Sequence, residues 1–327
     1  MAASLDHDLI ELGGAGIAIT ELGRADVASA GSGVVRVGVH RGGGLPSGGL
    51  EAFDILLTAA PAAPRPWVSA PGDALDTALA RLSEEVARQP TAAAAAAQVL
   101  RSTLKLPFDE ALALESLAYS MLLASGGFRA WRAATPSRDR PDDGAPRVSI
   151  EDRGGELVIR LTRPERRNAF DARMRDELVE ALTFAAVHPD APPVFLCGAG
   201  PAFSTGGDLD EFGRADDVGL AHLIRTLRSP AGLVHELGGR LTVRLHGACV
   251  GAGIEVPAAA ARVTAAPGAV FRLPEVSMGL IPGAGGTASI PRRIGRRRAA
   301  YMAISGAEID LPTALAWGLV DAEAPVS

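Results

Sequence analysis

Two glutamates stand in segments whose composition suits paired acid and base chemistry. Glu255 ends the run GAGIE, and Glu275 follows twenty residues later in the run FRLPEV. Each follows a stretch able to end a strand and start a helix, so the two carboxylates can reach one pocket. Their neighbours are Gly, Ala, Ile, Val and Pro, unlike those of a solvated helix face. If both are buried, one can act as acid and the other as base near neutral pH, and such a pair can add or remove water.

Two glycine-rich segments are expected to position these carboxylates and to offer backbone N–H groups. They run from Gly198 to Gly213 and from His246 to Pro257. Tight turns of this kind can bind a phosphate or a developing oxyanion, and the residues alone do not separate the two. Ser204 is one substitution away from a nucleophile elbow, but no partner histidine has a suitable spacing. A GAGGTA run beginning at Gly283 imitates a dinucleotide fingerprint without its flanking strand and acidic partner.

Composition excludes several other classes of function. The chain has 327 residues with 47% hydrophobic content and 21% charge, which is typical of a globular protein with a large core. Its formal net charge of -6 and its scattered arginines argue against a nucleic-acid partner. Cys197 and Cys249 lie in apolar runs and are interpreted as buried thiols, and the six histidines lack ligand spacing, so no metal is expected.

The start of the chain and its hydropathy predict a cytoplasmic protein without a membrane partner. The first residues, MAASLDHDLIELGG, carry acids where a signal peptide needs a basic region. No apolar stretch reaches the ~20 residues of a spanning helix.

The periodicity of the chain changes twice. Short β-type runs at Gly16 to Glu21, Val34 to His40 and Phe53 to Ala59 are followed by helical spacing from Asp73. Three helices are predicted, the last ending before Gly126 and Gly127. A polar, proline-rich segment from residue 136 to 147 is the best boundary in the chain. After it, strands alternate with amphipathic helices, which predicts an α/β fold with a largely parallel sheet.

Four ordered motifs in the last half of the chain resemble the enoyl-CoA hydratase/isomerase (crotonase) family. They are RPERRNAF from Arg163, AFSTGGD from Ala202, HGACVGAGIE from His246 and LPEVSMGLIPGAGG from Leu273. The resemblance implies a spiral of ββα turns and an acyl-CoA thioester substrate, with coenzyme A entering only as part of that substrate and no separate cofactor. It also implies a homo-oligomer, either a trimer or a hexamer.

The resemblance assigns roles to residues by motif position. It makes Glu275 the proton donor to the α-carbon and Glu255 the group that holds and activates water. Backbone N–H groups of Thr205 and Ala252 would form an oxyanion hole for the thioester enolate. The residues implied to contact the substrate or its coenzyme A part are Arg166, Arg167, Ala169, Gly206, Gly207, Asp208, Gly251, Pro282 and Gly283.

The order of segments departs from the family pattern. Family members continue for several dozen residues as helices after the region matching WGLVDAE, whereas a similar helical region stands upstream here, from Asp73 to Arg132. We therefore expect a permuted arrangement with four parts: an N-terminal β-rich extension (1–72), a three-helix module (73–135), a linker (136–146) and a crotonase-like core (147–327). The alternative is an unrelated helical domain.

Hydration of a 2-enoyl-CoA is the function predicted from these motifs. An isomerase, thioester hydrolase or decarboxylase of the same fold is the first alternative, although many isomerases and other relatives keep only one of the two glutamates. A catalytically silent subunit or scaffold of an acyl-CoA-processing assembly is the second. The retained glutamate pair disfavours silence.

Overall fold

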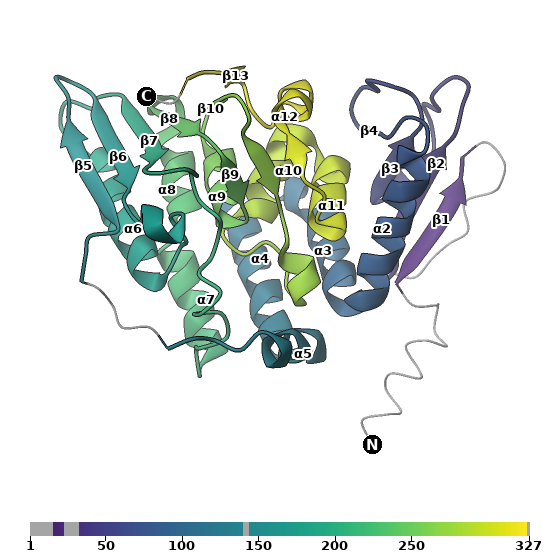
Figure 1. Ribbon diagram of the computed structural model, residues 1–327, viewed down its shortest axis with the longest axis horizontal. Coiled ribbons are helices and arrows are strands. Elements are labelled where there is room, and N and C mark those ends of the chain that lie inside the picture. The colour runs from purple at the N-terminus through teal and green to yellow at the C-terminus, as the bar shows by residue number, and fades with distance from the viewer. Residues whose placement is uncertain (1–15, 23–32, 140–143, 326–327) are drawn as a thin grey trace.

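The computed structural model describes residues 16–22, 33–139 and 144–325. Figure 1 shows a row of layers, with one sheet at each end and helices α3, α4, α10 and α11 between them. The mixture of sheets and helices confirms the predicted α/β class.

The N-terminal sheet is parallel, with strand order β1-β2-β3-β4 in the described residues. Its strands are β1 (Ile17–Glu21), β2 (Val35–His40), β3 (Ile55–Thr58) and β4 (Val68–Ser69). The three β-type runs predicted before residue 70 are confirmed as β1, β2 and β3. Strand β4 was not predicted, because it ends a proline-rich connector. Within the predicted extension 1–72, residues 1–15 and 23–32 lie outside the described residues.

The next segment forms helices that pack between the two sheets (Figure 1). They are α2 (Ala74–Arg88), α3 (Pro90–Ser102), α4 (Phe108–Leu123) and α5 (Gly126–Ala134). The prediction of three helices was therefore wrong by one. Gly126 and Gly127 were expected to follow the last helix, but they begin a new one, because the Ser125 side chain accepts a hydrogen bond from Phe128 N at 3.2 Å and caps it.

The core segment contains a six-stranded sheet in the described part of the chain, with order β13-β10-β8-β7-β6-β5. Its strands are β5 (Val148–Asp152), β6 (Leu157–Leu161), β7 (Val194–Gly198), β8 (Leu241–Leu245), β10 (Arg262–Ala265) and β13 (Ala322–Glu323). All neighbouring pairs are parallel except β5 and β6, so the predicted largely parallel sheet is confirmed. A smaller sheet joins β9 (Ala248–Val250), β11 (Val270–Arg272) and β12 (Ile309–Asp310).

Helices follow these strands and cover the sheet. They are α6 (Ala172–Val187), α7 (Val218–Leu227), α8 (Pro230–Leu237), α9 (Ala252–Glu255), α10 (Gly286–Ile294), α11 (Arg296–Ser305) and α12 (Leu311–Trp317). The helix predicted from Asp171 is confirmed as α6, where the Asp171 side chain accepts a hydrogen bond from Met174 N at 2.7 Å.

The upstream helices pack against the core segment, as expected of a module that folds back over it. Leu122 is fully buried and Leu112 packs against the main hydrophobic core, whereas Leu117 points outward with 55% of its surface exposed. Polar contacts also cross this boundary. Thr103 Oγ1 donates to Thr287 O at 2.7 Å, and the Arg292 guanidinium donates to the Leu106 carbonyl at 2.7 Å.

One continuous hydrophobic core joins all three segments. Val37 of the first sheet, Leu82 of α2, Leu122 of α4 and Ile159 of β6 are each fully buried in it. Both predicted buried thiols, those of Cys197 and Cys249, are confirmed as buried and free.

No single helix among the described residues has the length and apolar character to cross a membrane. Helices α4 and α5 meet those criteria only as a pair bent by 65°.

Candidate active site

Two adjoining cavities contain most of the predicted site residues. The first, of about 510 Å³, is lined by Glu115, Glu255 and Glu275 among others, and we call it the glutamate cavity. The second, of about 460 Å³, is lined by Arg132, Arg138, Arg166 and Arg167 among others, and we call it the arginine cavity. Gly207 and Asp208 line both cavities, so the two spaces meet at the loop that follows β7.

Glu255 is the last residue of α9, a short helix that begins directly after β9 and Gly251. Its side chain is buried, and its Oε2 atom accepts hydrogen bonds from Ala284 N at 2.8 Å and Gly286 N at 3.0 Å. Burial raises the pKa of Glu255 to about 7, while the backbone N–H donors oppose the shift because they favour the carboxylate. Glu255 can therefore change protonation state near neutral pH.

Glu275 begins a 3-10 turn (Glu275–Met278) after β11, and it is also buried. Burial, followed by the nearby Glu255 charge, raises the pKa of Glu275 well above its ordinary value. Its Oε2 atom is buried and has no hydrogen-bond partner among the described residues. A buried polar atom without a partner is costly unless a ligand satisfies it, so this oxygen is free to act on a substrate.

Gly251 explains how the two carboxylates approach each other. Its φ of 51° favours glycine, and a Cβ atom there would lie 2.5 Å from Glu275 Oε1 and 3.7 Å from Glu255 Oε1. The two side chains therefore converge on this glycine. The predicted convergence of Glu255 and Glu275 in one pocket is confirmed.

A third buried glutamate, Glu115 of α4, was not predicted. Its Oε1 atom accepts from Gly285 N at 2.7 Å, and its Oε2 atom accepts from Thr287 N and Thr287 Oγ1, both at 2.7 Å. Burial, followed by the Glu255 charge, raises the pKa of Glu115 to about 8 despite these hydrogen bonds. The available signal was a carboxylate three residues after Leu112 and four after Ala111, on the apolar face of its helix.

Glu115 and Glu255 hold one turn between them. Along the chain from residue 284 to 287, successive N–H groups donate alternately to Glu255 and to Glu115. This turn begins α10, where unpaired N–H groups favour negative charge. An upstream helix thus fixes the same turn that orients a glutamate of the core segment.

The two predicted oxyanion donors differ in this structure. Ala252 lines the glutamate cavity, and its N–H group has no acceptor among the described residues. Thr205 lines the arginine cavity instead, and its N–H group donates to Arg167 O at 3.1 Å. Of the two N–H groups predicted to form the oxyanion hole, the one of Ala252 is available to a ligand and the one of Thr205 is already hydrogen-bonded. Positive φ angles at Arg167 (50°) and Asn168 (53°) mark the turn that brings this carbonyl to Thr205.

The two arginines predicted to reach coenzyme A are also unlike each other. Arg166 is paired with Asp208 and Asp210, each at 3.3 Å, while Arg167 is exposed and has no side-chain partner in the described part of the chain. Arg163 also pairs with Asp208 at 3.0 Å. The Asp208 carboxylate is thus paired with two arginines while it lines both cavities, and its contact with the substrate stays a prediction.

Some of the remaining residues predicted to contact the substrate line a cavity, and others lie behind the cavity walls. Ala169 lines the arginine cavity, Gly283 lines the glutamate cavity and Gly207 lines both. Gly206, Gly251 and Pro282 line neither cavity, and their contacts with the substrate stay predictions. Gly206 instead permits close packing, since a Cβ atom there would lie 2.8 Å from Val250 O.

Ser204 is not a nucleophile. It is fully buried, its hydroxyl donates to Asn168 O at 2.8 Å, and it accepts from Gly206 N at 3.1 Å. Among the described residues, no group of three or more His, Cys, Asp or Glu side chains is arranged to hold a metal ion.

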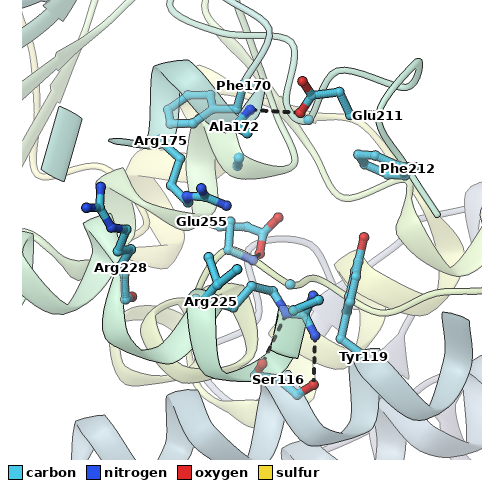
Figure 2. A pocket seen from close by; sticks show the side chains of 18 of the residues that line it. Ser116, Tyr119, Phe170, Ala172, Arg175, Glu211, Phe212, Arg225, Arg228 and Glu255 are labelled. Carbon is cyan, nitrogen blue, oxygen red and sulfur yellow. Dashed lines mark hydrogen bonds between the residues drawn. The ribbon is translucent and has the colours of Figure 1, made fainter. Parts of the chain in front are cut away.

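The wall of the glutamate cavity mixes apolar and cationic side chains. In Figure 2, Glu255 lies between Phe170 on one side and the pair Arg225 and Ser116 on the other, with Tyr119 beside Arg225. Tyr119 and Ser116 come from α4 and Arg225 from α7. The upstream helices therefore form part of the cavity wall.

Fold and site define an α/β protein with a buried carboxylate pair beside a cationic cavity. The family model for enoyl-CoA hydratase/isomerase matches residues 151–327. The chain belongs to this family, and the predicted resemblance is confirmed.

Three relatives show the extent of the similarity. A probable enoyl-CoA hydratase of Rhodobacter capsulatus is 36% identical over 167 residues, or 51% of this chain and 64% of the relative. The 1,2-epoxyphenylacetyl-CoA isomerase of Escherichia coli is 32% identical over 171 residues, or 51% of this chain and 65% of the relative. A crystal structure of enoyl-CoA hydratase from Thermoplasma volcanium matches with a TM-score of 0.51 and 32% identity, covering 56% of this chain and 73% of that one.

These matches confirm a crotonase-type core. The chain spans less than two thirds of the length of the curated relatives it matches.

Proposed function

We propose that the chain adds water to the double bond of a 2-enoyl-CoA. The observation that carries the proposal is the pair of buried glutamates in one cavity with unlike surroundings. Two N–H donors favour the carboxylate form of Glu255, while no donor meets Glu275 Oε2. Glu255 therefore gives up its proton more readily, and Glu275 retains its own.

The division of labour follows from these states. Ionised Glu255 takes a proton from water as the water oxygen bonds to C3 of the acyl group. Protonated Glu275 gives its proton to C2, and the Ala252 N–H group stabilises the negative charge that develops on the thioester oxygen. Because Glu255 has a pKa of about 7, hydration is expected to fall as pH drops below that value.

The coenzyme A part of the substrate fits the arginine cavity. Its phosphates are anions, and exposed Arg167 offers a guanidinium with no internal partner among the described residues. No separate cofactor is required for this reaction.

Double-bond isomerisation is the second candidate. The Oε2 atom of Glu275, which has no hydrogen-bond partner among the described residues, can move a proton between carbons without any water. One relative, from Mycosarcoma maydis, is named an enoyl-CoA isomerase/hydratase, which also supports this alternative.

The deciding assay follows the loss of conjugated thioester absorbance when crotonyl-CoA is added. We expect hydration by the wild type and its loss in Glu275→Gln. Exposed Glu308 is the matched control, and Glu308→Gln is expected to keep wild-type activity. If no short or medium enoyl-CoA is turned over, the proposal is wrong.

We further propose that residues 73–135 take the place of helices that follow the core in other family members. Support comes from the hydrogen bonds of Glu115 to Gly285 and Thr287, which tie this segment to the turn that orients Glu255. The partial coverage of the relatives is consistent with it.

An oligomer, either a trimer or a hexamer, is also proposed. Helix α7 exposes Leu220, Leu223 and Leu227, the last with 82% of its surface free, and apolar surface of this kind favours burial against another copy. Light scattering after size exclusion would test this, and a monomer at micromolar concentration would contradict it.

A further inference from the structure

Arg225 is a cation in the wall of the glutamate cavity with no carboxylate partner in the described residues. Its guanidinium donates to Ser116 Oγ at 3.0 Å, to Ser116 O at 3.4 Å and to Ser120 Oγ. Its guanidinium carbon lies 4.9 Å from the centroid of the Tyr119 ring. Every one of these partners is neutral. Burial lowers the pKa of Arg225, and the charges of Tyr119 and Glu115 oppose this shift without cancelling it.

Three other arginines line the cavity. Arg214 is exposed and donates to Arg138 O at 3.0 Å, and the remaining two share one carboxylate. Arg175 contacts Asp176 at 2.9 Å, and Arg228 contacts the same carboxylate at 3.2 Å. The cavity wall that contains Arg225 also includes the apolar side chains of Leu112, Leu123, Phe170, Phe212 and Ile224. A partly buried guanidinium in such a wall is stabilised when a ligand carboxylate binds it.

The position of Arg225 indicates which end of the substrate it meets. The arginine cavity joins the glutamate cavity at Gly207 and Asp208, and Phe170 is bonded to that loop through Phe170 N to Gly206 O and Asp208 N to Phe170 O, each 2.8 Å. Figure 2 shows Glu255 between Phe170 and Arg225. An acyl chain that enters from the arginine cavity passes the glutamates first and reaches Arg225 last.

We propose that Arg225 binds a carboxylate at the far end of the acyl chain, so that the preferred substrates are 2-enoyl-CoA thioesters of dicarboxylic acids. This inference rests on the proposed hydration at the same site. The guanidinium is held in place by Ser116, whose Oγ atom also contacts His222 Nδ1 at 2.9 Å. Arg225 is a specificity residue here and takes no part in the proton transfers.

A matched pair of substrates tests the inference. The six-carbon thioesters hex-2-enedioyl-CoA and hex-2-enoyl-CoA differ in carrying a carboxylate or a methyl group at the far end, and the eight-carbon pair repeats the comparison. We expect kcat/KM to favour the dicarboxylic substrate by about tenfold or more in at least one pair, the size expected of a charge-assisted hydrogen bond. Equal or better turnover of the methyl-ended substrate in both pairs would overturn the inference and leave the proposed function intact.

Variants separate recognition from structural support. In Arg225→Met we expect the preference ratio to fall to about one, whereas Arg225→Lys keeps part of it. Arg228→Met, in the same cavity but paired with Asp176, should keep the wild-type ratio. A purely structural role of Arg225 would lower kcat/KM for both substrates alike and preserve the ratio, and that result would contradict the inference.

Binding decides the question even if hydration is absent. Calorimetric titration with saturated adipyl-CoA and hexanoyl-CoA requires no turnover. We expect adipyl-CoA to bind about tenfold more tightly, and we expect Arg225→Met to remove the difference. Equal binding of the two ligands to the wild type would defeat the inference, while loss of hydration with tighter adipyl-CoA binding would contradict only the proposed function.

Discussion

The glutamate cavity and the arginine cavity share a loop, but the first buries its ionisable side chains and the second leaves one of its arginines exposed. In the first, Glu115, Glu255 and Glu275 are buried, and burial raises the pKa of each. In the second, Arg167 is exposed, and Arg166 is neutralised by the two aspartates beside it. This difference illustrates how two neighbouring cavities can bind different parts of one substrate. Buried glutamates with raised pKa values can exchange protons near neutral pH. An exposed arginine instead attracts anions over a longer range, and salt weakens that attraction.

Removing the acid of the glutamate cavity should have the largest effect. Glu275→Gln keeps the shape of the side chain but cannot give a proton to C2, so kcat for crotonyl-CoA hydration is expected to fall by about 10² to 10⁴. Steady-state kinetics, with binding of butyryl-CoA as a check on the site, would measure this. A loss smaller than tenfold would mean that Glu275 is not the acid.

Glu115 should matter more for stability than a glutamate on the surface of its own helix. Glu115→Ala leaves Gly285 N, Thr287 N and Thr287 Oγ1 without their acceptor, which is expected to cost about 3 kcal/mol or more in the free energy of unfolding. Urea denaturation measures this cost. Exposed Glu110 on α4 is the control, and Glu110→Ala should change the unfolding free energy by less than about 0.5 kcal/mol. Similar losses in both variants would argue against a special role for Glu115.

Much of the site could be predicted because the residues next to each glutamate in the sequence already indicate burial and tight turns. Glu255 and Glu275 stand in apolar and glycine-rich runs, and the need for glycine at position 251 follows from a turn that two carboxylates approach. Strands and helices of the core segment were also predicted, because alternation and helix caps such as Asp171 are local signals.

The missed features depend on distant contacts. Glu115 joins the site only because α4 packs against Gly285, which lies 170 residues further along the sequence. The extra helix α5 depends on the Ser125 side chain, which caps its first turn. This cap outweighs the tendency of Gly126 and Gly127 to end a helix. The occupied N–H group of Thr205 depends on the backbone turn at Arg167 and Asn168.

The raised carboxyl pKa values predict how stability depends on pH. A carboxyl group whose pKa is higher in the folded state binds more protons there, so its contribution is complete below the unfolded pKa and is lost as pH rises through the folded value. For Glu115 the window runs from the ordinary value of 4.5 to about 8. The free energy of unfolding is expected to fall across this range in the wild type, and less steeply in Glu115→Gln. Denaturant titrations at several pH values would show this, and identical slopes in both proteins would contradict the burial of an ionisable group here.

Substitution of an arginine in the arginine cavity should have the smallest effect on catalysis, and this effect should be the most sensitive to salt. Arg167→Ala removes an exposed guanidinium with no side-chain partner among the described residues, so we expect KM for crotonyl-CoA to rise about two- to fivefold, mainly through weaker phosphate attraction. Because exposed charges are screened, the increase should shrink at about 0.5 M salt. Arg262, exposed on β10 and outside both cavities, is the matched control, and Arg262→Ala should leave KM unchanged at either salt concentration. A salt-independent rise in KM would indicate that Arg167 shapes the turn at Thr205 rather than attracting phosphates, and the contrast between the two cavities would then rest on the glutamates alone.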